Sequence, residues 1–357
     1  MHYFLWINLT ILLSILSFLL KKIRISNYLI NTHILITIVL LLGFYVFRDI
    51  KLGSDFQGYV SHYDMLLNNE FSILAKEKEY LYIFLEKIFV FFNLPYEVFY
   101  GFLYTIIYIF IFKATNKYYF LSPLIVFSIF VGGFFFFSLS GVRQSLSIAI
   151  FFYSITFIIN KNIIQYILMI FFASLFHLSA IVLLPLYFIN KIKYYYKLFL
   201  FIYILTIIPQ IKFYINIFVE ILMKKTIELI PLLSPYLNYL ETNKVLQNGD
   251  TSLGFGFVLM QLINFIILIR AKSILSVNHY FKVYYILFFI SCTMYNLFYN
   301  VELITRINIY FNISFLIVFS LTIYYSYTKF QQIISLFLIF FSIILVQGRI
   351  NALLNYL

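Results

Sequence analysis

Cysteine is almost absent from this chain: Cys292 is the only one in 357 residues, and it lies within an apolar run. Without a second cysteine, an internal disulfide and a cysteine metal site are excluded, and thiol redox chemistry is not expected. The sequence also lacks a glycine-rich phosphate loop, paired metal-ligand spacing and any repeat of fixed period. Motifs of soluble nucleotide-dependent enzymes are therefore missing, and we expect no metal and no cofactor.

Charge is scarce as well, at 11% of residues, whereas 64% are hydrophobic and 22% aromatic. The mean hydropathy is +0.98. Apolar stretches of about 17–25 residues recur from end to end, and each is long enough as a helix to cross about 30 Å of hydrocarbon. The sequence therefore predicts an all-α fold, a polytopic membrane bundle of about 10–12 transmembrane helices that forms a single domain.

The apolar runs and the charged residues between them set the expected spans. Tyr3 to Leu20 has no basic residue before it, a basic cluster after it and no cleavage signal, so we interpret it as a retained span with an outer N-terminus. The other spans lie near residues 28–47, 96–112, 119–139, 142–160, 196–208, 253–269, 283–300, 307–327 and 331–346. Two outer loops remain, 48–95 and 209–252, which we expect to be partly ordered caps on the bundle.

This arrangement puts all 13 acidic residues on one side of the membrane. Of the 25 basic residues, about half fall on the other side with no acidic residue among them. Because short cytoplasmic loops are rich in Lys and Arg, the acidic side is expected to be the outer one. The pI near 9.4 then reflects membrane orientation and not nucleic-acid binding, since no compact basic patch accompanies it.

Two segments do not fit a simple span. Between Glu79 and Asn93, polar residues recur about every seven positions on one helical stripe, and two of them, Glu86 and Lys87, would each cost about 2.5–3.5 kcal/mol near the bilayer centre. We therefore predict an amphipathic interfacial helix in the first outer loop. Residues 163–189 are flanked by lysines and interrupted near their middle, which predicts a bent hairpin that enters and leaves from the cytoplasm.

Arg143 is the strongest candidate for chemistry. It opens a span after an outer turn, and it shares one helical face with Ser140, Ser147 and Ser154, so this face is expected to contact protein or water. A permanently charged guanidinium can donate two parallel hydrogen bonds to phosphate oxygens, which suits a lipid pyrophosphate held at the interface. The alternative is an ordinary anchor that reaches lipid headgroups.

Other ionisable residues leave two interpretations each. Arg306 follows Glu302 by one helical turn, so the two form either a self-satisfied surface ion pair or part of an anion site. His177 lies near the tip of the expected hairpin, where it is either a proton carrier or phosphate ligand, or a structural hydrogen bonder between helices. Asp55 lies in an exposed loop with aromatic residues, which suits a general base beside a sugar, although Gly, Ser and Asp are also usual in turns.

Five short motifs occur in order along the chain. Arg48, Asp55, Tyr59 and Tyr63 follow the second span, and a Glu-led stretch, Glu79 to Tyr82, comes next. They are followed by Val142-Arg143-Gln144, by Phe176-His177-Leu178-Ser179-Ala180 and by Arg306-Ile307-Asn308-Ile309-Tyr310-Phe311. Together these motifs resemble the EpsG/Wzy family of bacterial O-antigen, capsular and exopolysaccharide polymerases.

The resemblance implies a glycosyltransferase on the outer face of the bacterial inner membrane. Its substrates would be polyprenyl-pyrophosphate-linked oligosaccharides, and a chain-length regulator and a flippase are implied partners. The catalytic residues would be Arg143 with Asp55 or His177 as proton acceptor, and Arg143 and Arg306 would hold the pyrophosphate. The remaining matched positions and their neighbour would bind substrate: Arg48, Tyr59, Tyr63, Glu79, Gln144 and Glu302.

Three alternatives act on the same glycans. A flippase or transporter also needs a cationic site in a helical bundle, but no duplicated halves are visible. A membrane acyltransferase is disfavoured because clustered histidine and arginine early in the chain are missing. The ligase that moves finished O-antigen to lipid A shares the chemistry of polymerisation and stays open.

The orientation predicts where reporters fused to the chain become active. A reporter fused after Asn69 or Asn248 should report the outer side, and one after Asn116 or Lys272 the cytoplasm, because of the distribution of acidic and basic loops. Paired alkaline phosphatase and fluorescent protein fusions measure this. The opposite pattern at any of these four positions would contradict the arrangement of spans.

Overall fold

The computed structural model describes residues 2–20, 27–68, 79–208, 254–278, 280–298 and 301–354, together with isolated residues between 210 and 225. These residues are helical wherever they are regular, so the predicted all-α class is confirmed. They fall into two compact units: Met1–Ile192 with Phe315–Leu357, and Lys193–Ser314. Most of the expected outer loop 209–252 lies outside the described residues.

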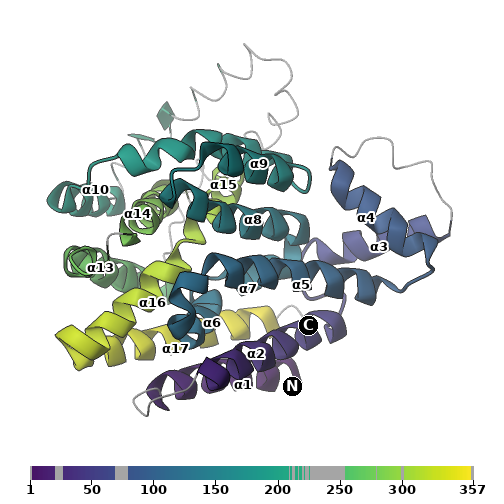
Figure 1. Ribbon diagram of the computed structural model, residues 1–357, viewed down its shortest axis with the longest axis horizontal. Coiled ribbons are helices and arrows are strands. Elements are labelled where there is room, and N and C mark those ends of the chain that lie inside the picture. The colour runs from purple at the N-terminus through teal and green to yellow at the C-terminus, as the bar shows by residue number, and fades with distance from the viewer. Residues whose placement is uncertain are drawn as a thin grey trace. The chain divides into compact units, whose positions relative to one another are not determined.

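The first unit contains most of the helices (Figure 1). They are α1 (His2–Leu20), α2 (Asn27–Phe47), α3 (Phe56–Leu67), α4 (Tyr80–Phe91), α5 (Tyr96–Ala114), η2 (Asn116–Leu121), α6 (Ser122–Val131), α7 (Phe134–Ser140), α8 (Val142–Ile159), α9 (Ile163–Ser174), η3 (Leu178–Lys191), α16 (Phe315–Tyr325), η6 (Ser326–Phe330) and α17 (Gln332–Leu354). The second unit contains α10 (Tyr196–Ile207), α13 (Phe255–Leu275), α14 (Phe281–Phe298) and α15 (Glu302–Asn312).

Several helices are long and apolar enough to cross a membrane. Five qualify in the described residues, namely α5, α8, α13, α14 and α17, and the number rises to seven if each of two bent helix pairs is one span. The chain is therefore a multi-pass membrane protein. The expected spans at 28–47, 96–112 and 142–160 agree with α2, α5 and α8 to within a few residues.

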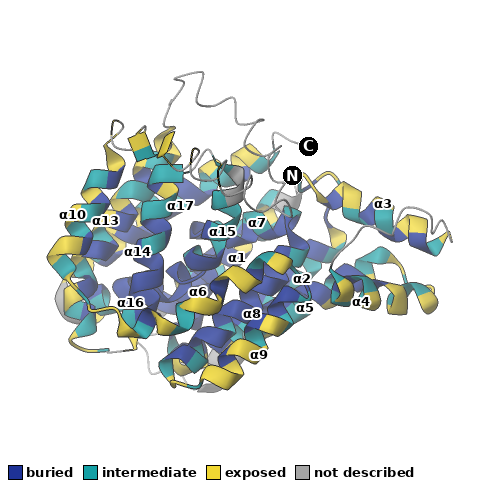
Figure 2. Ribbon diagram, turned by 90° about the horizontal axis from the view of Figure 1, so that it is seen from above, coloured by how far each residue is buried: buried dark blue, intermediate teal, exposed yellow. Residues whose placement is uncertain are grey.

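Helix α8 is central to the first unit, where it packs between α5 and α9 (Figure 1). Figure 2 shows it almost entirely buried, in contrast to the exposed outer edge of α9. Ser147 and Ser154 on the predicted polar face are fully buried, so this face contacts protein. Small side chains there allow the neighbouring helices to approach closely, as is usual in membrane bundles.

The expected span at 119–139 is not one helix. It breaks between α6 and α7 with a bend of 57°, at Gly132 and Gly133. Gly133 has φ +82, and a Cβ there would lie 2.9 Å from Nη1 of Arg349. That nitrogen donates to the carbonyls of Phe130 at 3.1 Å and Val131 at 2.6 Å. Arg349 thus satisfies the C-terminal carbonyls of α6, and only glycine leaves it enough room.

The segment 163–189 forms the predicted bent hairpin. Helices α9 and η3 pack against each other, and the Tyr166 hydroxyl donates to the carbonyl of Leu183 at 2.6 Å. Asn162 starts α9 by accepting from the backbone N–H of Gln165. The chain reverses direction at Leu175–His177, so His177 lies at the tip as expected.

The second unit has a buried polar network. Gln261 accepts from the hydroxyl of Tyr203 and donates to Asn296 at 2.7 Å, and Asn296 donates to Thr206 at 3.0 Å. These side chains join α10, α13 and α14. Because each group has a partner, the network stabilises helix packing within an apolar environment.

The loop before α3 is anchored at a glycine. Gly53 has φ +116, and a Cβ at this position would lie 2.3 Å from the carbonyl oxygen of Leu139. The backbone N–H of Ser54 donates to Oγ of Ser140 at 3.0 Å. The loop that leads from α2 to α3 is therefore pressed against the turn between α7 and α8, immediately before Arg143.

Gly53→Ala should destabilise the protein by about 1–3 kcal/mol, because the left-handed backbone is strained for alanine and the Leu139 carbonyl must move. Gly58→Ala is the matched control, since Gly58 lies in α3 with open space around it. This control should be neutral or stabilise by up to about 1 kcal/mol. Thermal unfolding midpoints in detergent compare the two, and equal midpoints would contradict the prediction.

Candidate functional site

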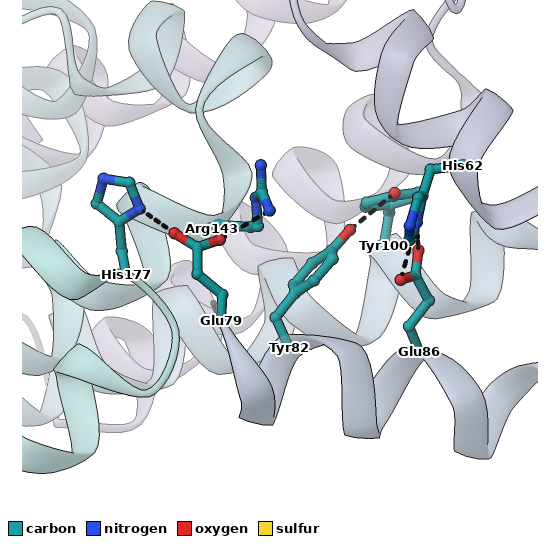
Figure 3. A network of polar contacts seen from close by, with 7 residues as sticks. All are labelled: His62, Glu79, Tyr82, Glu86, Tyr100, Arg143 and His177. Atoms are coloured by element: carbon teal, nitrogen blue, oxygen red, sulfur yellow. Dashed lines mark hydrogen bonds and ion pairs between the residues drawn. The ribbon is translucent and has the colours of Figure 1, made fainter. Parts of the chain in front are cut away.

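A cluster of three ionisable side chains, Glu79, Arg143 and His177, lies in the first unit (Figure 3). We call it the Glu79 cluster. Nη1 of Arg143 lies 2.8 Å from Oε2 of Glu79, and Nδ1 of His177 lies 2.5 Å from Oε1 of the same carboxylate. One carboxylate thus holds a guanidinium with one oxygen and an imidazole with the other.

Three segments far apart in the sequence position these side chains. Glu79 immediately precedes α4, Arg143 is in the first turn of α8, and His177 lies between α9 and η3. The backbone N–H of Leu81 donates to the carbonyl of Leu175 at 3.3 Å, which ties the start of α4 to the tip of the hairpin. Neighbouring backbone atoms therefore set the short distance between Glu79 and His177.

Two tyrosine rings lie beside the guanidinium of Arg143. Its Cζ is 5.0 Å from the ring centroid of Tyr59 and 5.4 Å from that of Tyr82, within the range of a cation–π interaction. Burial raises the pKa of the Tyr59 phenol, and Arg143 partly opposes the shift. Tyr59 is therefore neutral at physiological pH and available as a hydrogen-bond donor or acceptor.

The Glu79 cluster remains partly accessible. The side chains of Arg143 and His177 are 24% and 25% exposed, and that of Glu79 is 13% exposed. A partly desolvated cation, carboxylate and imidazole within direct contact distance can bind an anion and transfer a proton. In the described residues, no three His, Cys, Asp or Glu side chains converge to hold a metal ion.

A model described as the EpsG family matches residues 31–350. The chain belongs to the EpsG family. The matched region includes all three segments of the Glu79 cluster, and the EpsG family is associated with polymerase- and glycosyltransferase-type activity in polysaccharide synthesis. Neither the curated proteins nor the solved structures include a significant match to the chain.

A second histidine–glutamate pair in this EpsG-family protein joins α3 to α4. Nδ1 of His62 in α3 is 3.1 Å from Oε2 and 3.2 Å from Oε1 of Glu86 in α4. Between the two pairs, the hydroxyl of Tyr82 is hydrogen-bonded to that of Tyr100 at 3.0 Å (Figure 3). Burial and the nearby Glu86 raise the pKa of Tyr63 to about 12.

The polar stripe that predicted the interfacial helix is covered by protein at Glu86. Glu86 is 0% exposed, because α3 packs against the polar side of α4. A repeat of seven residues places side chains on one face but does not say whether water or another helix covers that face. The helix itself is present as expected, and its position at the membrane interface stays a prediction.

The predicted residues of the first outer loop take different positions. Asp55 is exposed, and its Oδ1 accepts from the hydroxyl of Ser54 at 2.9 Å; it does not touch the Glu79 cluster. Tyr63 is fully buried and donates to the carbonyl of Leu94 at 2.8 Å. Of the predicted loop residues, Tyr59 is the one whose side chain lies beside Arg143.

Arg48 is only 5% exposed. Its Cζ lies 3.6 Å from the ring centroid of Phe56. Its nitrogens make no hydrogen bond of ordinary geometry to a described residue, and the rings of Phe56, Tyr45 and Tyr104 around its Cζ stabilise the cation. Arg48 therefore connects the end of α2 to the start of α3.

The other predicted residues lie around or apart from the cluster. Gln144 follows Arg143 in α8 and is buried. Arg306 is half-buried in α15 of the second unit, and the side chain of Glu302 lies outside the described residues. Sequence reasoning assigned no role to Tyr82, which lies beside Arg143, or to His62, which pairs with Glu86 outside the Glu79 cluster. Their signal would have been their spacing from Glu79 and Tyr59 on the two helices.

His62→Ala should destabilise the protein by about 1–3 kcal/mol, because it removes one partner of the buried carboxylate of Glu86. Glu86→Gln should have a smaller effect, since an amide of the same shape can still bond to a neutral imidazole. Thermal unfolding in detergent at pH 7 measures both. A larger loss for Glu86→Gln than for His62→Ala would contradict the assigned pairing.

Proposed function

We propose that the protein is a polysaccharide polymerase, a glycosyltransferase that joins polyprenyl-pyrophosphate-linked oligosaccharides on the outer face of the bacterial cytoplasmic membrane. The observation that carries this proposal is the Glu79 cluster, a partly exposed arginine, carboxylate and histidine in a multi-pass EpsG-family chain. The oligosaccharide would be the repeat unit of an O-antigen, a capsule or an exopolysaccharide.

The chemistry of such a transfer needs two kinds of group. A hydroxyl of the incoming lipid-linked repeat attacks the anomeric carbon of the growing chain, whose bond to lipid pyrophosphate breaks. Negative charge builds on the pyrophosphate, so a cation must stabilise it, and the acceptor hydroxyl must lose its proton to a base. Arg143 supplies a cation, and the carboxylate and imidazole beside it are candidate bases.

No nucleotide sugar takes part in this reaction, because both saccharides arrive on lipid pyrophosphates. The absence of a nucleotide-binding motif in the sequence fits this substrate class. A site at the boundary of the membrane also suits a substrate whose lipid tail stays in the bilayer while its saccharide is in water. Arg306 is proposed as a second pyrophosphate ligand on the strength of its match to the family motif.

The experiment is deletion of the gene followed by complementation with Arg143→Ala and Arg306→Ala, with glycan length read on a gel. Arg143→Ala should lower polymer by on the order of 10²-fold, and single repeats should remain attached on the outer face. Arg270→Ala is a control, because this arginine of α13 is expected on the cytoplasmic side. It should make chains of normal length.

Two other results would reject the proposal. If deletion leaves single repeats on the cytoplasmic face, export is the function and the chain is a transporter. If long polymer forms but is not attached to its final acceptor, the chain is a ligase. Normal chain lengths in both Arg143→Ala and Arg306→Ala would show that these arginines are membrane anchors and not ligands of the pyrophosphate.

A further inference from the structure

The contact between His177 and Glu79 is directional. The imidazole faces the carboxylate with Nδ1, at 2.5 Å from Oε1. Nε2 is on the opposite side of the ring (Figure 3) and makes no hydrogen bond to a described residue. The side chain is 25% exposed, so a substrate hydroxyl can reach this nitrogen.

A carboxylate on one ring nitrogen determines the tautomer of a histidine. An ionised carboxylate accepts only, so Nδ1 must carry the proton, and the lone pair is then on Nε2. The same contact fixes the rotation of the ring and stabilises the imidazolium that forms after proton uptake. An imidazole held in this way is suited to accept a proton from a hydroxyl.

We propose that Nε2 of His177 is the general base of the transfer reaction and that Glu79 is its positioning residue. The assignment rests on the proposed function, since it supposes that the substrate is a saccharide with a hydroxyl to be deprotonated. Of the two candidate bases from the sequence, the assignment selects His177 and not Asp55. Asp55 is exposed, and it is bonded to Ser54 rather than to the cluster.

Arg143 completes the arrangement. Its Nη1 pairs with Oε2, the carboxylate oxygen that His177 does not use. The ion pair holds one carboxylate oxygen and so favours the orientation in which Oε1 points to Nδ1. Arg143 therefore acts on the base through Glu79, in addition to providing a cation for the leaving group.

The proton and electron balance of the step is complete with these groups. The acceptor O–H transfers its proton to Nε2 while its oxygen forms a bond with the anomeric carbon of the donor saccharide. The bond between that carbon and the pyrophosphate oxygen breaks, and the electron pair leaves with the pyrophosphate. The imidazolium then releases its proton to water, which returns His177 to its starting form.

The second pair, His62 and Glu86, provides an internal control. It has the same chemical groups, with His62 in α3 and Glu86 in α4. The imidazole is 21% exposed and the carboxylate 0% exposed, and neither group belongs to the proposed base or to its positioning residue. A variant there tests the effect of changing a carboxylate to an amide in α4 without changing the base.

The first test compares Glu79→Gln with Glu86→Gln. Purified protein would extend lipid-linked oligosaccharide extracted from the gene-deletion strain, and initial rates would be measured from pH 5 to 9. The charged groups facing the imidazole are Glu79 and Arg143, with Tyr59 and Tyr82 beside Arg143. Loss of the negative charge makes the imidazolium less favourable, so it forms only at lower pH.

Glu79→Gln should therefore move the acid limb of the rate profile down by about one pH unit and lower the plateau rate by on the order of 10²-fold. Glu86→Gln should keep the wild-type limb. An unmoved limb in Glu79→Gln would falsify the assignment, whereas wild-type protein that cannot extend the extracted substrate at all would reject the proposed function instead.

The second test does not depend on activity. Nitrogen-15 magnetic resonance of histidine-labelled wild-type protein, with the signals of His177 identified by their loss in His177→Asn, distinguishes protonated from unprotonated ring nitrogens. At pH 8 the expected form has a proton on Nδ1 and none on Nε2. A proton on Nε2 alone would overturn the proposal even if Glu79→Gln failed to fold.

Discussion

The ion pair between Arg143 and Glu79 joins segments that are far apart in the sequence. It brings the start of α4 to the start of α8, and the second carboxylate oxygen adds the hairpin tip that carries His177. In a chain with 11% charged residues, an ionised group close to apolar helices must be compensated within a few ångströms. Each member of the Glu79 cluster meets this requirement for the others, so losing one changes the environment of the other two.

The individual site residues could be predicted from the sequence because ionisable groups are conspicuous in an apolar chain. Arg143 and His177 each interrupt a hydrophobic pattern, and Glu79 ends a charged run immediately before one. Their contacts could not be predicted, since the segments lie 64 and 98 positions from Glu79 in the sequence. Helical periodicity gives the face on which a residue lies, but the element that covers the face depends on tertiary packing.

In the fold, too, features set by neighbouring residues could be predicted, whereas features set by residues far away in the sequence could not. Helices α2, α5 and α8 begin and end close to the predicted positions, because hydrophobic length and flanking charge are local properties. The break at Gly132 and Gly133 was not predicted, because it depends on Arg349, whose carbonyl partners are 218 and 219 positions away. The burial of Glu86 could not be predicted for a similar reason, since its partner His62 is on another helix.

Helix α4 is held at two points on one face. Glu79 engages His177 and Arg143, and Glu86, two turns further along, engages His62. A cylinder attached at two such points can neither roll about its axis nor slide along it without breaking at least one attachment. The carboxylate of Glu79 therefore keeps a constant angular setting relative to α3, and any displacement of this edge of the unit must move α3 and α4 together.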